Sequence, residues 1–129
     1  MSICPICAID ASSHSFDLLY HMDNVLVFYS CPANATKYND TDGILTHFKL
    51  ALDFYKCCEN NWEWIFDFKG FELKHIMEIR TAIGIAGIIN NYSKYLTKIR
   101  IINMNRYTHT MMKIVMPFLN KDVQSKIYL

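Results

Sequence analysis

The chain has 129 residues, of which 52% are hydrophobic, 14% aromatic and 19% charged. This length suits one compact domain with a buried core, and the small numbers of glycines and prolines, four and three, exclude collagen-like and proline-rich chains. The longest uncharged apolar run, residues 83–89, is far shorter than the roughly 20 residues that a membrane-spanning helix needs. We therefore expect a chain that does not cross a bilayer.

The formal net charge of +1 conceals an uneven distribution. Residues 1–93 hold six Lys or Arg against eleven Asp or Glu, whereas residues 94–129 hold seven against Asp122 alone. A basic C-terminal third can attract anionic lipid, nucleic acid or an acidic partner, and it can equally be a solvated face without a ligand. Charge by itself does not choose among these.

The five cysteines and the N-terminal sequence indicate in which cellular compartment the protein resides. An odd number of cysteines, and an N-terminus without a basic stretch or a hydrophobic signal core, favour a reducing compartment. We expect a cytoplasmic protein, peripheral to membranes at most. Cys4 and Cys7 form a Cys-x-x-Cys pair at the start of the chain, but it does not follow an expected strand and lacks the helix N-terminus that redox chemistry needs. A zinc site would need a second pair, and only His14 and His21 follow nearby, so no metal is expected.

The first 22 residues show no clean periodicity and are interpreted as an irregular lead-in. We expect an edge strand over residues 3–9 and a loop over residues 10–15. Asp23 and Asn24 have turn chemistry, and the domain itself is expected to span residues 23–129.

Strands and helices alternate in the remainder of the chain. Short apolar or alternating runs predict strands over residues 25–29, 62–68, 98–103 and 127–129. Apolar stripes at helical spacing predict helices over residues 43–60, capped by Asp42, and over 72–92 and 107–119, with a turn over 122–126. Helical crossovers between strands imply a single α/β domain with a largely parallel or mixed sheet.

Several short motifs carry no chemistry. Glu72 and His75 have the spacing of a di-iron pair, but a second pair and two further carboxylates are absent from the sequence. Gly84 and Gly87 lie inside an apolar helical pattern and do not form a phosphate loop. No nucleophile elbow, Walker sequence or dinucleotide fingerprint occurs. We expect neither an enzyme nor a cofactor.

Five short sequences from residue 62 onward stand in the order and at the separations of a known family. They are residues 67–70 at a strand end, 91–92 at a helix end, 101–103 in a strand, 116–119 at a helix end and 126–127 at a strand start. Together they resemble the Sec14-like CRAL-TRIO lipid-binding domain, which has Asp-Leu-x-Gly, Tyr-Pro-Glu-Arg, Ile-Ile-Asn, Lys-Pro-Phe-Leu and Lys-Ile at these places. The resemblance extends loosely over residues 23–129.

The resemblance implies a sheet roofed by a movable gate helix, with a phospholipid or other acyl lipid bound between them or transferred, and no catalytic step. Residues 107–119 match the gate helix of the family. Their apolar side chains on nearly all sides suit a helix that covers a hydrophobic cavity. A core helix without any ligand is the alternative. The expected lipid-binding wall consists of Trp64, Phe66 and Phe68 on the sheet and Met111, Val115 and Phe118 on the gate.

This sequence departs from the family's pattern at the positions that bind the lipid headgroup. Phosphatidylinositol-binding members use a glutamate at the helix end together with a lysine in the Lys-Ile sequence. Lys126 matches that lysine, but Lys94 stands at the glutamate position, so the phosphoinositide pairing is broken. Two cations favour a more anionic headgroup or no specific one. We expect Lys94, Arg106 and Lys126 to face a headgroup or an anionic membrane.

The sequence also leaves a second function open. It shows neither the N-terminal helical subdomain of the family nor the residues that follow the Lys-Ile strand, which places it near the short, divergent branch with the BCH domains, known as protein-interaction modules. An interaction module without a lipid cavity is therefore the alternative function. Without the residues that complete the pocket wall, apolar surface would be exposed, so a homodimer that covers this surface is the expected assembly. Nucleic acid ranks below membrane contact, because no recognition motif is visible.

Overall fold

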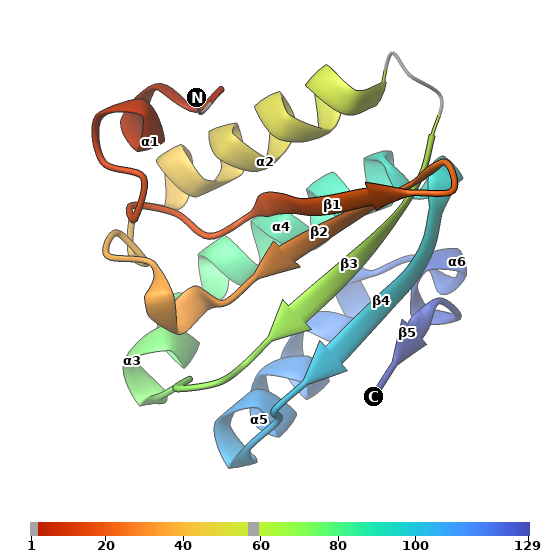
Figure 1. The fold of residues 1–129 in the computed structure, drawn as a ribbon. Helices are drawn as coiled ribbons and strands as arrows, with labels where there is room; N and C mark the ends of the chain where they lie inside the picture. The colour runs from red at the N-terminus through yellow and green to blue at the C-terminus, as the bar shows by residue number, and fades with distance from the viewer. Residues whose placement is uncertain (1–2, 57–59) are drawn as a thin grey trace.

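The computed structural model describes residues 3–56 and 60–129. Within these residues a five-stranded sheet forms the centre, in the order β1-β2-β3-β4-β5 (Figure 1). The strands are β1 (Asp17–Met22), β2 (Val25–Ser30), β3 (Asn61–Asp67), β4 (Leu96–Ile102) and β5 (Ile127–Tyr128). β1 pairs antiparallel with β2, and β2-β3, β3-β4 and β4-β5 are parallel.

Helices connect the parallel strands. The α-helices are α1 (Pro5–Ile9), α2 (Thr41–Lys56), α3 (Leu73–Ile76), α4 (Ile79–Asn91), α5 (Arg106–Val115) and α6 (Lys121–Gln124), and short 3-10 helices are η1 (Pro32–Asn34), η2 (Ser93–Tyr95) and η3 (Met116–Phe118). Right-handed crossovers between sequential strands place the connecting helices on one face, and α4 and α5 lie behind the strands in Figure 1. α4 packs against both α2 and α5. In the described part of the chain, no helix has the length and apolar character that crossing a bilayer requires.

The predicted fold class is confirmed: the protein is an α/β domain with a mixed sheet and crossover helices. The strands expected over residues 25–29, 62–68, 98–103 and 127–129 are β2, β3, β4 and β5, each within a few residues of its expected bounds. Alternation in β3 reflects its packing, since Trp62 and Trp64 are buried beneath the helices while Glu63 is only half-buried.

The N-terminal segment differs from its expected structure. The strand expected over residues 3–9 is wrong, because these residues contain α1, with Pro5 at its first position, where a missing N–H costs nothing. β1 was not expected at all. It is an edge strand whose side chains are nearly all exposed, so it carries no apolar alternation. Asp23 and Asn24, with φ of 53° and 64°, form the two-residue turn that joins β1 to β2 as a hairpin.

The helix expected over residues 72–92 is two helices, α3 and α4. Met77 ends α3, and Glu78 before α4 has φ −87° and ψ 46°, outside the helical region. Neither glycine nor proline marks this break, so the apolar spacing continues across it. The helix expected over residues 107–119 is also shorter: α5 ends at Val115, and the chain tightens into η3 around Pro117.

The first long helix begins two residues before its expected start. Asp40 provides the cap in place of Asp42, since its Oδ1 accepts the N–H of Gly43 at 3.2 Å and its carbonyl accepts the N–H of Ile44 at 2.9 Å. Asp42 lies inside the first turn, where a carboxylate suits the helix dipole. The expected end of this helix, residues 57–60, falls largely outside the described residues.

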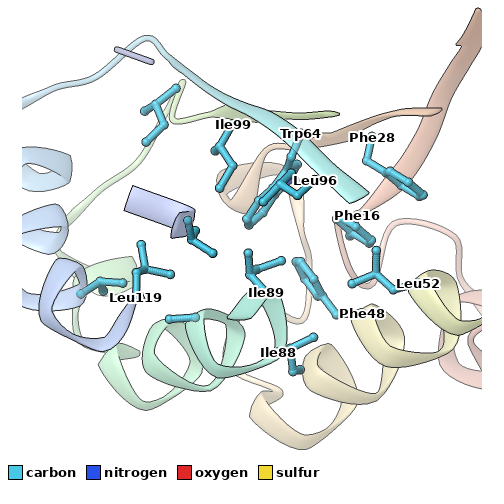
Figure 2. Close-up of a cluster of buried hydrophobic side chains, with 14 of the residues drawn as sticks. Phe16, Phe28, Phe48, Leu52, Trp64, Ile88, Ile89, Leu96, Ile99 and Leu119 are labelled. Carbon is cyan, nitrogen blue, oxygen red and sulfur yellow. The ribbon is translucent and has the colours of Figure 1, made fainter. Parts of the chain in front are cut away.

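The core lies between the sheet and the helices and is rich in aromatic rings (Figure 2). Phe16 is at its centre: its ring centroid lies 4.1 Å from that of Phe48 on α2 and 4.8 Å from that of Phe28 on β2. Trp64 meets the Phe16 ring edge-on at 5.8 Å. The segment before β1 therefore contributes a central core residue.

Candidate functional site

An apolar cavity of about 140 Å³ lies between the helix-covered face of the sheet and the helices α2, α4 and α5. Most of the side chains that line it are aliphatic or aromatic and come from sheet and helices alike. We call α5 with η3 the gate, because these residues cover the cavity opposite β3 and β4. The geometry suits a hydrophobic guest held by shape and dispersion forces.

The sheet wall contains all three residues expected there. Trp64, Phe66 and Phe68 alternate along β3 and its extension, and each lines the cavity. Their rings form a continuous surface, with centroids 4.7 Å apart between Trp64 and Phe66 and 4.4 Å apart between Phe66 and Phe68. Trp64 Nε1 donates to Ser30 Oγ at 2.9 Å, so the polar atom of the buried indole has a partner.

The gate wall differs at one position. Met111 and Val115 line the cavity as expected, together with Met112 and Leu119, whereas Phe118 is not part of the lining and is 49% exposed. The cause is local: the chain leaves α5 at Val115, and the 3-10 turn around Pro117 points Leu119 inward in place of Phe118. The gate is also less apolar than expected, because His109, Thr110 and Lys113 are exposed.

Asparagines fasten both ends of the gate. At the N-terminal end Asn105 Oδ1 accepts the N–H groups of Tyr107 and Thr108, and Asn105 Nδ2 donates to the Phe71 carbonyl at 2.9 Å. At the C-terminal end Asn90 Nδ2 donates to the Phe118 carbonyl at 2.9 Å, and Asn90 Oδ1 accepts the N–H of Asn120 at 3.0 Å. Moving the gate away from its neighbours means breaking the bond from Asn105 to Phe71 at one end or the bonds of Asn90 at the other.

The cavity has a polar end near α3, where His75, Glu78 and Thr81 join the lining. Burial, with Lys74 nearby, lowers the pKa of His75, and its Nδ1 accepts the N–H of Glu72 at 2.9 Å. The imidazole is thus neutral at pH 7, with its ring stacked on Phe71 at 5.1 Å. This end could accept a polar but uncharged group of a ligand.

The expected headgroup residues do not converge on this cavity, and none of the three lines it. Lys94 and Lys126 lie together near the amino end of β4, where Lys126 Nζ donates to the Ser93 carbonyl at 2.9 Å and to Asp122 Oδ2 at 3.0 Å. Arg106 begins α5, beyond the carboxyl end of β4, so the strand's length separates it from the two lysines. A second cluster, of cysteine and histidine side chains, lies outside the cavity where the N-terminal segment meets α2.

Comparisons with known proteins identify the family. The model of the CRAL/TRIO domain matches residues 24–129. Among solved structures, the chain is similar to the one described as "Crystal structure of Sfh5", with 16% identity and a TM-score of 0.61, over 88% of this chain and 46% of that chain. This likeness shows the fold, and the chain spans about half the length of that structure. A search of curated proteins found no match. Because the family model covers most of the residues, including the gate and nearly all of the cavity lining, the chain belongs to the CRAL/TRIO domain family.

Proposed function

We propose that this chain binds an acyl lipid or a similar hydrophobic molecule in the cavity between β3, β4 and the gate, and transfers it without a catalytic step. The observation that carries the proposal is the largely apolar cavity, closed on one side by a helix whose two ends are each tied to neighbouring elements by asparagine hydrogen bonds. A hydrophobic ligand needs such a wall, and a ligand that enters and leaves needs a wall that moves.

The volume sets a limit on what the closed form can hold. Pockets for drug-sized ligands span about 300–1,000 Å³, whereas a dry cavity of about 150 Å³ holds a benzene molecule or a xenon atom. The 140 Å³ seen here is in the second class. A long acyl chain therefore enters only if the gate moves away from the sheet.

The energies make that movement feasible. Each methylene moved out of water contributes about 0.8 kcal/mol, so ten methylenes supply about 8 kcal/mol before ordering costs. The bonds at the C-terminal end of the gate, from Asn90 to Phe118 and from Gln124 to Met116, contribute about 0.5–1.5 kcal/mol each. A bound chain also replaces the apolar contacts that Met111 and Val115 lose. The ligand's burial thus exceeds the cost of breaking these bonds.

The direct test is the ligand content of the purified protein. Native mass spectrometry and organic extraction should reveal bound lipid, and a fluorescent fatty acid or phospholipid in vesicles should pass to the stripped protein. A protein that neither carries lipid after purification nor takes any from labelled vesicles would contradict the proposal.

Two variants on the same helix link any uptake to the cavity. Met112→Trp places a bulky ring into the lining, and we expect it to reduce lipid uptake at least about tenfold because the guest and the indole compete for one space. Ile114→Trp is the matched control, since Ile114 is 41% exposed and does not line the cavity. Equal uptake by both variants, with both shown to be folded by thermal melting, would place the lipid elsewhere.

An interaction module is the second candidate function. The observation in its favour is the cavity volume, which is below the roughly 300 Å³ at which ligand pockets begin. In this case the fold works through its surface and the interior stays filled. Absence of lipid uptake in a stable, folded protein would favour it over the first proposal.

The cellular setting belongs to the proposal as well. We propose a cytoplasmic protein that meets anionic membranes transiently through the basic residues of its C-terminal third. A homodimer that covers exposed apolar side chains such as Tyr128 and Leu129, beside the edge strand β5, is the assembly we propose. Light scattering of the chain at high micromolar concentration would detect it, and a strict monomer would exclude it.

A further inference from the structure

Four buried side chains from distant parts of the chain meet beside α2. They are Cys4 and Cys7, at and within α1, His14 in the loop before β1, and His47 on α2. The atoms through which they could hold a metal, two sulfurs and two ring nitrogens, all lie within 4.8 Å of one another. In Figure 1 α1 lies against the first turns of α2, which brings these segments together.

The distances fit a tetrahedral zinc site. The Sγ atoms of Cys4 and Cys7 each lie 3.6 Å from His14 Nδ1, and Cys7 Sγ lies 3.4 Å from His47 Nδ1. Zinc with Zn–S of about 2.3 Å and Zn–N of about 2.05 Å at the tetrahedral angle separates sulfur from nitrogen by about 3.6 Å. An ion can therefore occupy the centre with small movements of the four side chains.

The outer hydrogen bonds orient both imidazoles toward that centre. His47 Nε2 lies 2.6 Å from the carbonyl oxygen of Phe16, which can only accept, so Nε2 carries the proton and Nδ1 turns its lone pair toward the Cys7 thiol. His14 Nε2 lies 3.0 Å from Asp40 Oδ2, a carboxylate that imposes the same tautomer. Metal-bound histidines in proteins have this arrangement, with the second nitrogen donating to a carbonyl or a carboxylate.

We propose that Cys4, Cys7, His14 and His47 bind one zinc ion in a closed, structural site. Two sulfurs and two imidazole nitrogens are a ligand set of structural zinc sites, and with all four positions filled by buried side chains no position is left for substrate. Binding replaces the two thiol protons, which leave as the ion enters, so the buried site carries no net charge.

The site would fasten the N-terminal segment to the rest of the domain. His14 and His47 flank Phe16, whose ring stacks on Phe48 at the centre of the core, and Asp40 both caps α2 and holds His14. The ion would thus join α1, the loop before β1 and α2. This inference does not rest on lipid binding, and its test is independent of the lipid-uptake test.

The test measures metal in the purified protein. Every protein carries Cys57→Ser and Cys58→Ser, so that metal bound by those residues is not counted, and none carries a histidine tag. After purification under reducing conditions without chelator, we expect about one zinc per chain by plasma mass spectrometry. Cys7→Ser and His47→Gln should each reduce the zinc content at least about tenfold. Cys31→Ser is the matched control, because Cys31 is also buried, at 2% exposure, and lies outside the cluster.

A second measurement needs no variant that alters a ligand. Chelator-stripped protein with all four ligands intact is refilled with Co²⁺, and we expect the absorption bands of tetrahedral cobalt bound to thiolate. Stripping should lower the melting temperature by about 10 °C or more, and zinc should restore it. Protein that holds no zinc and shows no cobalt–thiolate band contains a hydrogen-bonded thiol–imidazole cluster instead, which overturns the proposal. A Cys4–Cys7 disulfide that persists under reducing conditions would overturn it as well.

Discussion

The hydrogen bond between Ser30 and Trp64 allows a quantitative test of the cavity wall. Ser30 is 2% exposed and Trp64 is 4% exposed, and Ser30 Oγ accepts the indole N–H at 2.9 Å. Ser30→Ala leaves that N–H buried without its acceptor. The rest of the wall is largely apolar, so a water that replaced the hydroxyl would have few partners.

The expected cost follows from desolvation. A buried donor without a partner costs about 1–3 kcal/mol, which corresponds to a fall in melting temperature of about 4–12 °C for a domain of this size. In a Trp64→Phe background the donor is gone, so Ser30→Ala should cost less than about 0.5 kcal/mol there. The coupling energy of the pair, which is the difference between these two costs, should therefore be about 0.5–3 kcal/mol.

Urea unfolding of the four proteins, wild type, both single variants and the double variant, measures this coupling directly. An equal cost of Ser30→Ala in both backgrounds would refute the reasoning, because it would mean that the serine contributes through packing and not through the indole. The same variants should be compared for lipid uptake, since the bond also holds the Trp64 ring against the cavity.

Two further predictions concern the gate and the strand ends. Asn90→Ala should increase amide hydrogen exchange over residues 115–120 with little loss of global stability. Asn91→Ala, at an exposed neighbouring position, should leave this exchange unchanged. Unchanged exchange in Asn90→Ala would mean that Asn90 does not hold the gate. Burial raises the pKa of Asp67, but hydrogen bonds from Tyr29, Asn103 and the Lys69 N–H outweigh it, so the net pKa is lowered. The ionised Asp67 carboxylate stabilises the fold fully above the unfolded pKa of about 3.9, and this stabilisation is lost as the pH falls through the lower pKa of the folded state. The difference in unfolding free energy between wild type and Asp67→Asn, measured by urea unfolding, should therefore shrink below about pH 4. A constant difference down to about pH 2 would contradict this.

The parts of the fold that the sequence predicts correctly are those in which periodicity and burial coincide. β3 buries one face beneath the helices, so alternation locates both the strand and the wall residues Trp64, Phe66 and Phe68. β1 pairs only at an exposed edge, and an exposed edge leaves no apolar period to detect. The break between α3 and α4 lacks a glycine or proline and depends on tertiary packing. Phe118 was misplaced because Pro117 changes the helical rotation just before it.

The cysteine–histidine cluster could not be found from spacing. Cys4, Cys7 and His14 are near one another in the chain, but the fourth side chain of the cluster comes from outside that short segment. His47 is 33 positions beyond His14 and reaches the cluster only because α2 packs beside α1. Linear motifs describe sites built on one loop, whereas this cluster is assembled by the packing of separate elements. The signal available in the sequence was a Cys-x-x-Cys pair with histidines at unremarkable distances.

Membrane contact is best tested at the C-terminal end of the gate, where basic and apolar side chains meet. Asn90 ties the exposed Phe118 to the end of α4, and Lys94 and Lys126 follow around Ser93. Each cation near an anionic surface contributes about 1 kcal/mol, and Lys126 contributes less because Asp122 already pairs with it. Replacing Lys94 and Lys126 by glutamate removes both attractions and adds the repulsion of two carboxylates, so it should weaken binding to anionic vesicles by about 30-fold at low salt, with a smaller effect at high salt. Arg106→Glu, at the other end of β4, should change it far less. Equal co-sedimentation of wild type and double variant, with and without anionic lipid at two salt concentrations, would mean that these lysines are only solvated.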